Sequence, residues 1–317
     1  MFVEKKVPKS QLKPSDVIPD KVGGHKTDVV GRTGEISAQT TRRVRPIPGG
    51  YSCGHIRVTA GTMGGWFVDR DGDVVGLSNN HVLANENKAV IAGQYYRGKR
   101  RVGDATVQPG VYDNRRWRHN MVGNLKSFVK LNSADNLQDS AIFKPYRRAL
   151  VESRIQGVGQ LSGFRDDLAV GETVQKVGRT TGHTVGRVIA TDGVVNVRYG
   201  PRLGVIEFED QIITDHMSEG GDSGSLLLDM SNNVVGLLFA GSSSVTIHNK
   251  IKYPREQWGL QVYDPSPLTE TFSSTLTVDG VDEVSSSMGD LNSLVAKARK
   301  LARGGKSVSL NISFSAD

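Results

Sequence analysis

The chain has 317 residues, enough for about two domains with buried cores, which excludes a small disulfide scaffold. Its 37 glycines lie well above the ~7% usual in globular proteins and favour many tight turns, hence β structure. The net charge of +7 would allow an acidic partner, while a single cysteine, Cys53, excludes an intramolecular disulfide.

Residues 1–52 are predicted to form an extended N-terminal arm. They carry five prolines, from Pro8 to Pro48, and few apolar runs. The chain opens without the apolar core of a signal peptide, and no run of ~18 apolar residues occurs in it. We therefore expect a soluble, cytoplasmic protein that makes no contact with a membrane.

Residues 53–150 and 151–264 are predicted to form two β units. Short segments rich in β-branched residues alternate with Gly, Asp and Asn, and residues 69–73 (DRDGD) provide the turn of a hairpin over 66–77. Glycines cluster at the break between the units, around residues 157–163. Because no helical periodicity separates the strands, the pattern predicts an all-β core, a sandwich or a barrel rather than βαβ units.

The segment Arg97–Arg118 holds seven basic and two acidic residues. Its Gly, Pro and Asp content indicates a long solvated loop, and the alternative is a contact surface for an acidic substrate or a nucleic acid. Aromatic residues lie in or near it, at Tyr95, Tyr96 and Trp117, but no nucleic-acid-binding module is recognisable. Nucleic acid is therefore not the expected partner.

Residues 265–317 are predicted to form a small strand-helix-strand appendage. Residues 274–278 and 308–314 alternate like strands, and an apolar helical stripe lies between them, ended by glycines at 304 and 305. The stripe consists of Leu291, Leu294, Val295, Ala298 and Leu301. So few residues cannot bury that stripe alone. Three alternatives stay open: packing on the second β unit, docking of residues 267–317 against another copy or a regulatory partner, and disorder.

The strongest chemical signal is the turn Glu219–Ser225 (EGGDSGS) before an apolar strand. Ser223 could be a plain turn residue. A hydrolytic serine needs an imidazole base, a group that orients the base, and backbone N–H donors for an oxyanion. The glycines beside Ser223 allow the N–H groups of Gly221 and Ser223 to serve as those donors.

A base and its orienting acid precede this turn in the chain. His81 lies where an apolar strand ends in a polar turn, and Asp139 lies at the entry to another apolar strand. Asp135 is the alternative acid, four residues earlier. The order His, Asp, Ser is that of chymotrypsin-type enzymes, and Ser225 breaks the G-x-S-x-G elbow of α/β-hydrolases.

These blocks carry a family resemblance. The chain resembles trypsin-like serine peptidases of the chymotrypsin fold at three places: the Ser block at residues 221–225, the His block at 78–83 and the Asp block at 139–141. Residues 176–186 resemble the G-x-T-T-G-x-x-x-G segment that opens the second barrel of streptogrisin and α-lytic protease. A closer similarity is to intracellular bacterial peptidases related to the plant NARROW LEAF 1 protein, and it is carried by residues 3–30 of the arm, 78–85 and 236–241. The resemblance covers residues 1 to about 262.

The resemblance implies a chymotrypsin-like double six-stranded β-barrel and a serine endopeptidase acting on proteins or peptides, without cofactor or metal. By analogy, Met217 forms the floor of the first specificity pocket, and Phe239, Ala240 and Gly241 form its wall. No carboxylate stands there, so small or apolar side chains are expected at the cleaved position. A catalytically silent pseudo-peptidase that binds a protein partner is the alternative.

Two departures from the family bear on this site. In zymogen-derived relatives the Asp before the serine pairs with a new N-terminus; no propeptide or cleavage motif is visible here, so we expect Asp222 to find another partner or to stay exposed. Phe239 stands where trypsin-like enzymes usually have a serine that supports the triad Asp.

Overall fold

The computed structural model describes residues 40–96 and 99–265, together with short segments before residue 40 and three strands after residue 269. The chain divides into two compact units, Met1–Tyr263 and Asp264–Asp317.

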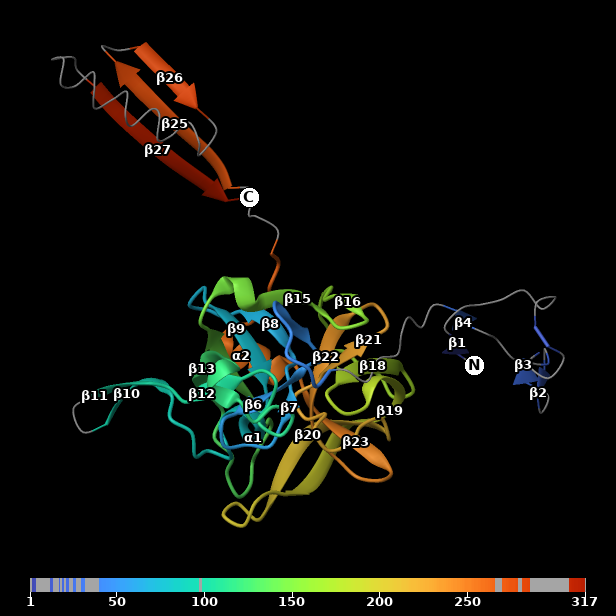
Figure 1. Cartoon of the computed structure of the whole chain (residues 1–317). Helices are drawn as coiled ribbons and strands as arrows, with labels where there is room; N and C mark the ends of the chain where they lie inside the picture. The colour runs from blue at the N-terminus through green and yellow to red at the C-terminus, as the bar shows by residue number, and fades with distance from the viewer. Residues whose placement is uncertain are drawn as a thin grey trace. The chain divides into compact units, whose positions relative to one another are not determined.

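The first sheet of the larger unit has the strand order β24-β8-β9-β14-β13-β12-β6-β7 and is shown in blue to green, apart from β24, in Figure 1. All of its pairings are antiparallel. The predicted hairpin joins β8 to β9, and the Asp69 carboxylate accepts the N–H groups of Asp71 and Asp73 in its turn. The strands are β6 (Ser52–His55), β7 (Gly61–Thr62), β8 (Gly65–Val68), β9 (Val74–Ser78), β12 (Ala105–Val107), β13 (Met121–Phe128), β14 (Ala141–Pro145) and β24 (Gln261–Val262).

The second sheet closes on itself. Its order is β17-β22-β21-β18-β19-β20-β23, and β22 also pairs with β23, so six of the described strands complete a ring. They are β18 (Thr173–Gly178), β19 (Gly182–Arg198), β20 (Val205–Asp215), β21 (Leu226–Asp229), β22 (Asn233–Gly241) and β23 (Val245–Lys250), with β17 (Gly163–Phe164) at the edge. The predicted all-β core with a chymotrypsin-like double β-barrel is confirmed, the first sheet being curled and the second a closed ring.

Residues from both ends of the predicted arm contribute to small sheets. Among the described residues, β5 (Ile47–Gly49) pairs with β15 (Val151–Ile155), which also pairs with β16 (Gly159–Gln160). Residues 47–49 and residue 52 of the predicted arm are therefore part of the β sheets of the larger unit. The short pairs nearer the N-terminus are β1 (Phe2–Val3) with β4 (Val30–Gly31) and β2 (Lys21–Val22) with β3 (His25–Lys26).

An apolar cluster joins the two sheets. Phe67 and Leu77 of the first sheet and Leu226 and Leu237 of the second belong to the same buried group. Leu226 opens the strand that follows the Ser223 turn, and Leu77 lies near the end of the strand that precedes His81. Packing of the two sheets therefore brings together the segments that carry the candidate site.

Helical structure in the described part of the chain is short. It consists of α1 (Asn80–Leu83), α2 (Lys252–Trp258), and the 3₁₀ turns η3 (Trp117–His119) and η4 (Arg148–Leu150). None of the described helices is long and apolar enough to cross a membrane.

The basic segment Arg97–Arg118 is only partly a loop. It contains β11 (Lys99–Val102), which pairs with β10 (Ala92–Tyr96), and the buried strand β12. The strand β12 was not predicted because only three residues of this arginine-rich segment, 105–107, enter the sheet.

The smaller unit has the strand order β26-β25-β27 in its described part. The strands β25 (Glu270–Val278) and β27 (Val308–Ala316) contain the two predicted strands, whereas β26 (Val281–Ser285) was not predicted. The predicted helix with Leu291, Leu294, Val295, Ala298 and Leu301 lies outside the described residues.

Candidate active site

His81 is held by the turn that follows β9. The side chain of Asn80 donates to the carbonyl of Val129 and to Asn87 Oδ1, which fixes the turn and presents the next residue, His81. His81 Nδ1 lies 2.6 Å from Asp139 Oδ2, and its backbone N–H donates to Asp139 Oδ1 at 3.2 Å. Because a carboxylate accepts, Nδ1 carries the proton and Nε2 is left to act as a base.

The charge around the imidazole favours its protonated form. Burial alone lowers the pKa of His81, but the neighbouring charge and hydrogen bond of Asp139, with a further contribution from Glu86, raise it above its usual value. His81 is therefore a stronger base than an isolated histidine.

Asp139 is fully buried just before β14. Its N–H donates to Asn249 Oδ1 at 2.9 Å, and its carbonyl accepts from Asn79 Nδ2 at 2.7 Å. Asp135, the alternative acid, is exposed in a turn with φ of 59°. The structure thus pairs His81 with Asp139 and not with Asp135.

Hydrogen bonds link Ser223, through Thr62, to the end of the strand that precedes His81. The Ser223 carbonyl accepts from the N–H of Thr62 at 2.7 Å, and the carbonyl of Thr62 in turn accepts from Ser78 Oγ at 2.7 Å. The Ser223 hydroxyl donates to the carbonyl of Phe239 at 3.4 Å, and no hydrogen bond joins it to His81. Hydrogen bonds between nucleophile and base are often long without substrate and tighten when substrate binds.

Two backbone N–H groups of the serine turn are the predicted oxyanion donors. Among the described residues, neither Gly221 N nor Ser223 N donates to a protein acceptor. Gly221 has φ of 103°, and a Cβ there would lie 2.6 Å from Thr180 Oγ1, so both conformation and space require glycine. This turn leaves the two predicted oxyanion donors free.

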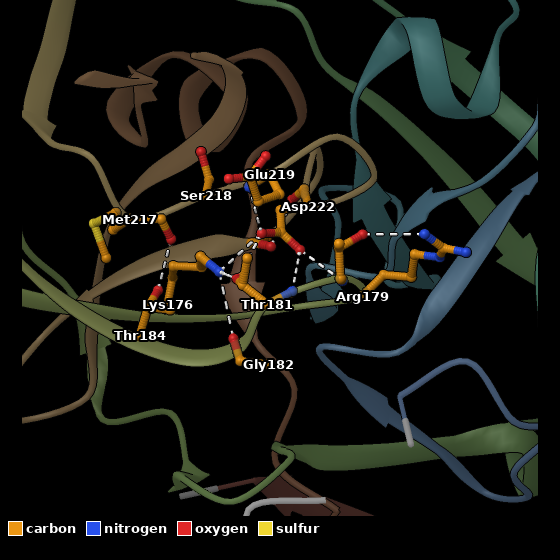
Figure 2. Close-up of polar contacts among 12 residues, drawn as sticks. Lys176, Arg179, Thr181, Gly182, Thr184, Met217, Ser218, Glu219 and Asp222 are labelled. Carbon is orange, nitrogen blue, oxygen red and sulfur yellow. Dashed lines mark hydrogen bonds and ion pairs between the residues drawn. The ribbon is translucent and has the colours of Figure 1, made fainter. Parts of the chain in front are cut away.

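The partner of Asp222 is Lys176, on β18 (Figure 2). Lys176 Nζ lies 3.1 Å from Asp222 Oδ2, and both side chains are fully buried. The same carboxylate accepts the N–H groups of Thr180 at 2.7 Å and Glu219 at 3.0 Å, and the Thr181 hydroxyl at 2.6 Å. Asp222 thus anchors the nucleophile turn from inside the second barrel.

Burial acts against both charges of this pair. It opposes ionisation of Asp222, but the charge of Lys176 and the surrounding donors outweigh it and lower the pKa of the carboxyl. Burial also lowers the pKa of Lys176, against the opposing attraction of Asp222. Lys176 was not predicted as this partner, although its place between Val174 and Val177 in a predicted strand was a signal.

A cavity of about 520 Å³ opens beside Ser223. It is lined by His216, Ser218, Glu219, Gly220, Ser223, Leu238, Ala240, Gly241, Ser242 and Ser243. His216, which was not predicted, contacts the Ser242 carbonyl through Nδ1 at 2.9 Å and lies 3.3 Å from Glu219 through Nε2.

Of the four predicted pocket residues, Ala240 and Gly241 line this cavity, while Met217 and Phe239 do not. Met217 is buried in an apolar cluster inside the barrel, and the Phe239 ring packs against Phe208 with centroids 4.6 Å apart. The neighbours of Met217, at positions 216 and 218, line the cavity in its place, as do Leu238 and Ala240 around Phe239. Alternation of side chains along extended backbone sends the intervening residue to the other face.

No set of three or more histidine, cysteine, aspartate or glutamate side chains is placed to hold a metal ion in the part of the chain that the structure describes. No family model matches the sequence, and no curated protein matches it.

Several solved structures are similar to this chain. A Nocardiopsis protease is 18% identical with a TM-score of 0.48, covering 69% of this chain and 99% of its own. A Cellulomonas bogoriensis chymotrypsin is 19% identical with a TM-score of 0.48, covering 68% and 98%. Thermobifida fusca protease A is 18% identical with a TM-score of 0.46, covering 68% and 97%.

Proposed function

We propose that the chain is a serine endopeptidase with the triad His81, Asp139 and Ser223. The observation that carries this proposal is the 2.6 Å contact between His81 and the buried Asp139, beside a serine turn with two free N–H groups. Together they supply a base, an orienting acid, a nucleophile and an oxyanion site.

In the proposed reaction the Ser223 oxygen attacks the peptide carbonyl carbon, and its proton passes to His81 Nε2. The carbonyl electrons move onto oxygen, where the N–H groups of Gly221 and Ser223 stabilise the negative charge. The C–N bond then breaks, and the leaving amine takes the proton from His81. Water attacks the acyl-enzyme in the same way, which releases the acid and restores Ser223.

The choice of acid provides one test of this proposal. Asp139→Asn is expected to lower kcat/KM for a fluorogenic peptide by ~10⁴, because the imidazole loses the acceptor that holds its tautomer. Asp135→Asn, at an exposed turn, is the matched control and is expected to retain the wild-type rate. Loss of activity in Asp135→Asn with retention in Asp139→Asn would contradict the assignment.

The cavity supports a proposal on the cleaved position. Glu219 supplies the carboxylate among its lining residues, but that side chain is 62% exposed and faces His216, so it offers no buried partner for a cation. Burying an unpaired lysine or arginine is costly. We expect cleavage mainly after small or apolar residues, measured by sequencing the products of a peptide library; cleavage mainly after Lys or Arg would contradict this.

A pseudo-peptidase that binds a protein is the second candidate, and one observation favours it: the Ser223 hydroxyl contacts the Phe239 carbonyl rather than His81. Covalent reaction of Ser223 with a fluorophosphonate separates the two candidates.

We further propose cytoplasmic proteins as substrates. Cys53 is fully buried and has no cysteine partner in the sequence, so no intramolecular disulfide holds the fold and the fold does not depend on an oxidising compartment. Mass-spectrometric comparison of cellular proteins exposed to wild-type enzyme and to Ser223→Ala would identify the substrates. Absence of any difference between the two samples would contradict this proposal.

A further inference from the structure

Tyr199 connects the second barrel to the candidate triad. It follows β19, in the turn between β19 and β20, the long hairpin in yellow in Figure 1. Its hydroxyl donates to Asp139 Oδ2 at 2.6 Å, the same oxygen that lies 2.6 Å from His81 Nδ1. One carboxylate oxygen of the first barrel therefore receives donors from both barrels.

The ring of Tyr199 is held by its neighbours. It lies edge-on to the His81 imidazole with centroids 6.0 Å apart, and it stacks on Phe208 at 6.1 Å. Phe208 in turn packs on Phe239. Stacking of this kind restricts the ring to one orientation and so fixes where its hydroxyl points.

The backbone of the turn is tied down as well. Tyr199 N donates to the Gly204 carbonyl at 2.8 Å, closing the hairpin. Gly200 N donates to Glu86 Oε1 at 3.0 Å, and Glu86 follows the α1 turn that carries His81. The hairpin is thus attached to the histidine segment at a second point, independent of the hydroxyl.

We propose that Tyr199 is a positioning residue of the triad, whose hydroxyl orients the Asp139 carboxylate toward His81. Phe239 stands where trypsin-like enzymes usually have a serine that supports the triad Asp, and it has no hydroxyl. Tyr199, from another segment, supplies a hydroxyl to Asp139 instead. This inference rests on the proposed function, since it concerns the same histidine and aspartate.

The Tyr199 hydroxyl keeps its proton and so remains a hydrogen-bond donor to Asp139 at neutral pH. Burial and the nearby charges of Asp139 and Glu86 raise the pKa of Tyr199 well above its usual value, so the phenol keeps its proton. The charged or titratable groups that act on His81 are Asp139 and Glu86, with Tyr199 neutral beside them. Removing the hydroxyl leaves Asp139 Oδ2 with the imidazole as its donor, so its negative charge acts more strongly on His81.

Tyr199→Phe tests the inference because it removes the hydroxyl and keeps the ring. We expect kcat/KM to fall about tenfold. We also expect the acid limb of the kcat/KM profile to move to higher pH, since His81 must be neutral to act as base and holds its proton more tightly. Tyr253→Phe is the matched control: its hydroxyl contacts Asp210, in a different ion-pair cluster, and it is expected to match wild type in both readouts.

A second readout does not depend on turnover. In the Ser223→Ala background, NMR titration of the His81 imidazole is expected to show a higher midpoint when Tyr199→Phe is added. A Tyr199→Phe variant with wild-type kcat/KM and a wild-type His81 titration midpoint would overturn the inference. So would a variant with lower kcat/KM whose pH profile and His81 titration midpoint are unchanged, because Tyr199 would then act only on the structure. An inactive wild-type enzyme would count against the proposed function, while the titration would still decide the inference.

Discussion

Ser223→Ala is expected to lower peptide hydrolysis by ~10⁴ or more while leaving the fold intact. The variant deletes the attacking oxygen, and removal of a triad member leaves only the catalysis supplied by the oxyanion site and substrate binding. Stability should change little, because the hydroxyl makes a single long bond, 3.4 Å to the Phe239 carbonyl. The measurements are kcat/KM on a fluorogenic peptide or casein, and the melting temperature.

Ser231→Ala is the matched control for this variant. Ser231 is exposed in the turn between β21 and β22, and its backbone rather than its side chain makes the hydrogen bonds of that turn. It should retain wild-type activity. Undiminished turnover by Ser223→Ala would remove the proposed nucleophile.

Lys176→Met is expected to destabilise the protein by about 3–5 kcal/mol, because it leaves the buried Asp222 carboxylate without its counter-charge. The double variant Lys176→Met/Asp222→Asn leaves no uncompensated charge and should be more stable than Lys176→Met alone. Urea denaturation of the three proteins measures these free energies of unfolding.

Lys176→Met should also reduce activity beyond its effect on stability. Asp222 accepts the N–H of Glu219 in the turn before Ser223 and the N–H of Thr180 in the turn between β18 and β19, so its displacement would misplace the oxyanion donors. Arg154→Met is the control, since Arg154 is exposed and lies 3.6 Å from Glu152, an arrangement worth less than about 1 kcal/mol. A loss of unfolding free energy in Lys176→Met as small as that in Arg154→Met would contradict the stabilising role of the pair.

Local sequence explains which parts of the site were predictable. Glycine turns, a strand end and a strand entry are local features that made Ser223, His81 and Asp139 candidates, and their order in the chain together with the family resemblance made them the predicted triad. The strand pattern likewise predicted the all-β core and the hairpin between β8 and β9.

The residues that were missed depend on contacts between distant segments. Lys176 meets Asp222 across 46 positions, and Tyr199 meets Asp139 across 60, because the second sheet closes and packs on the first. The residues around each partner in the sequence do not predict a contact between segments so far apart. Met217 and Phe239 were chosen by analogy of position, whereas side-chain alternation in the barrel directs them to its interior and sends their neighbours to the cavity.

The central claim is that His81 activates Ser223 as a nucleophile, and covalent labelling tests it most directly. The wild-type protein is treated with a fluorophosphonate, its mass is measured, and the modified peptide is sequenced. The proposed triad predicts one adduct, on Ser223, formed at a rate that collapses in His81→Ala. No adduct on Ser223, or equal labelling of wild type and His81→Ala, would contradict it.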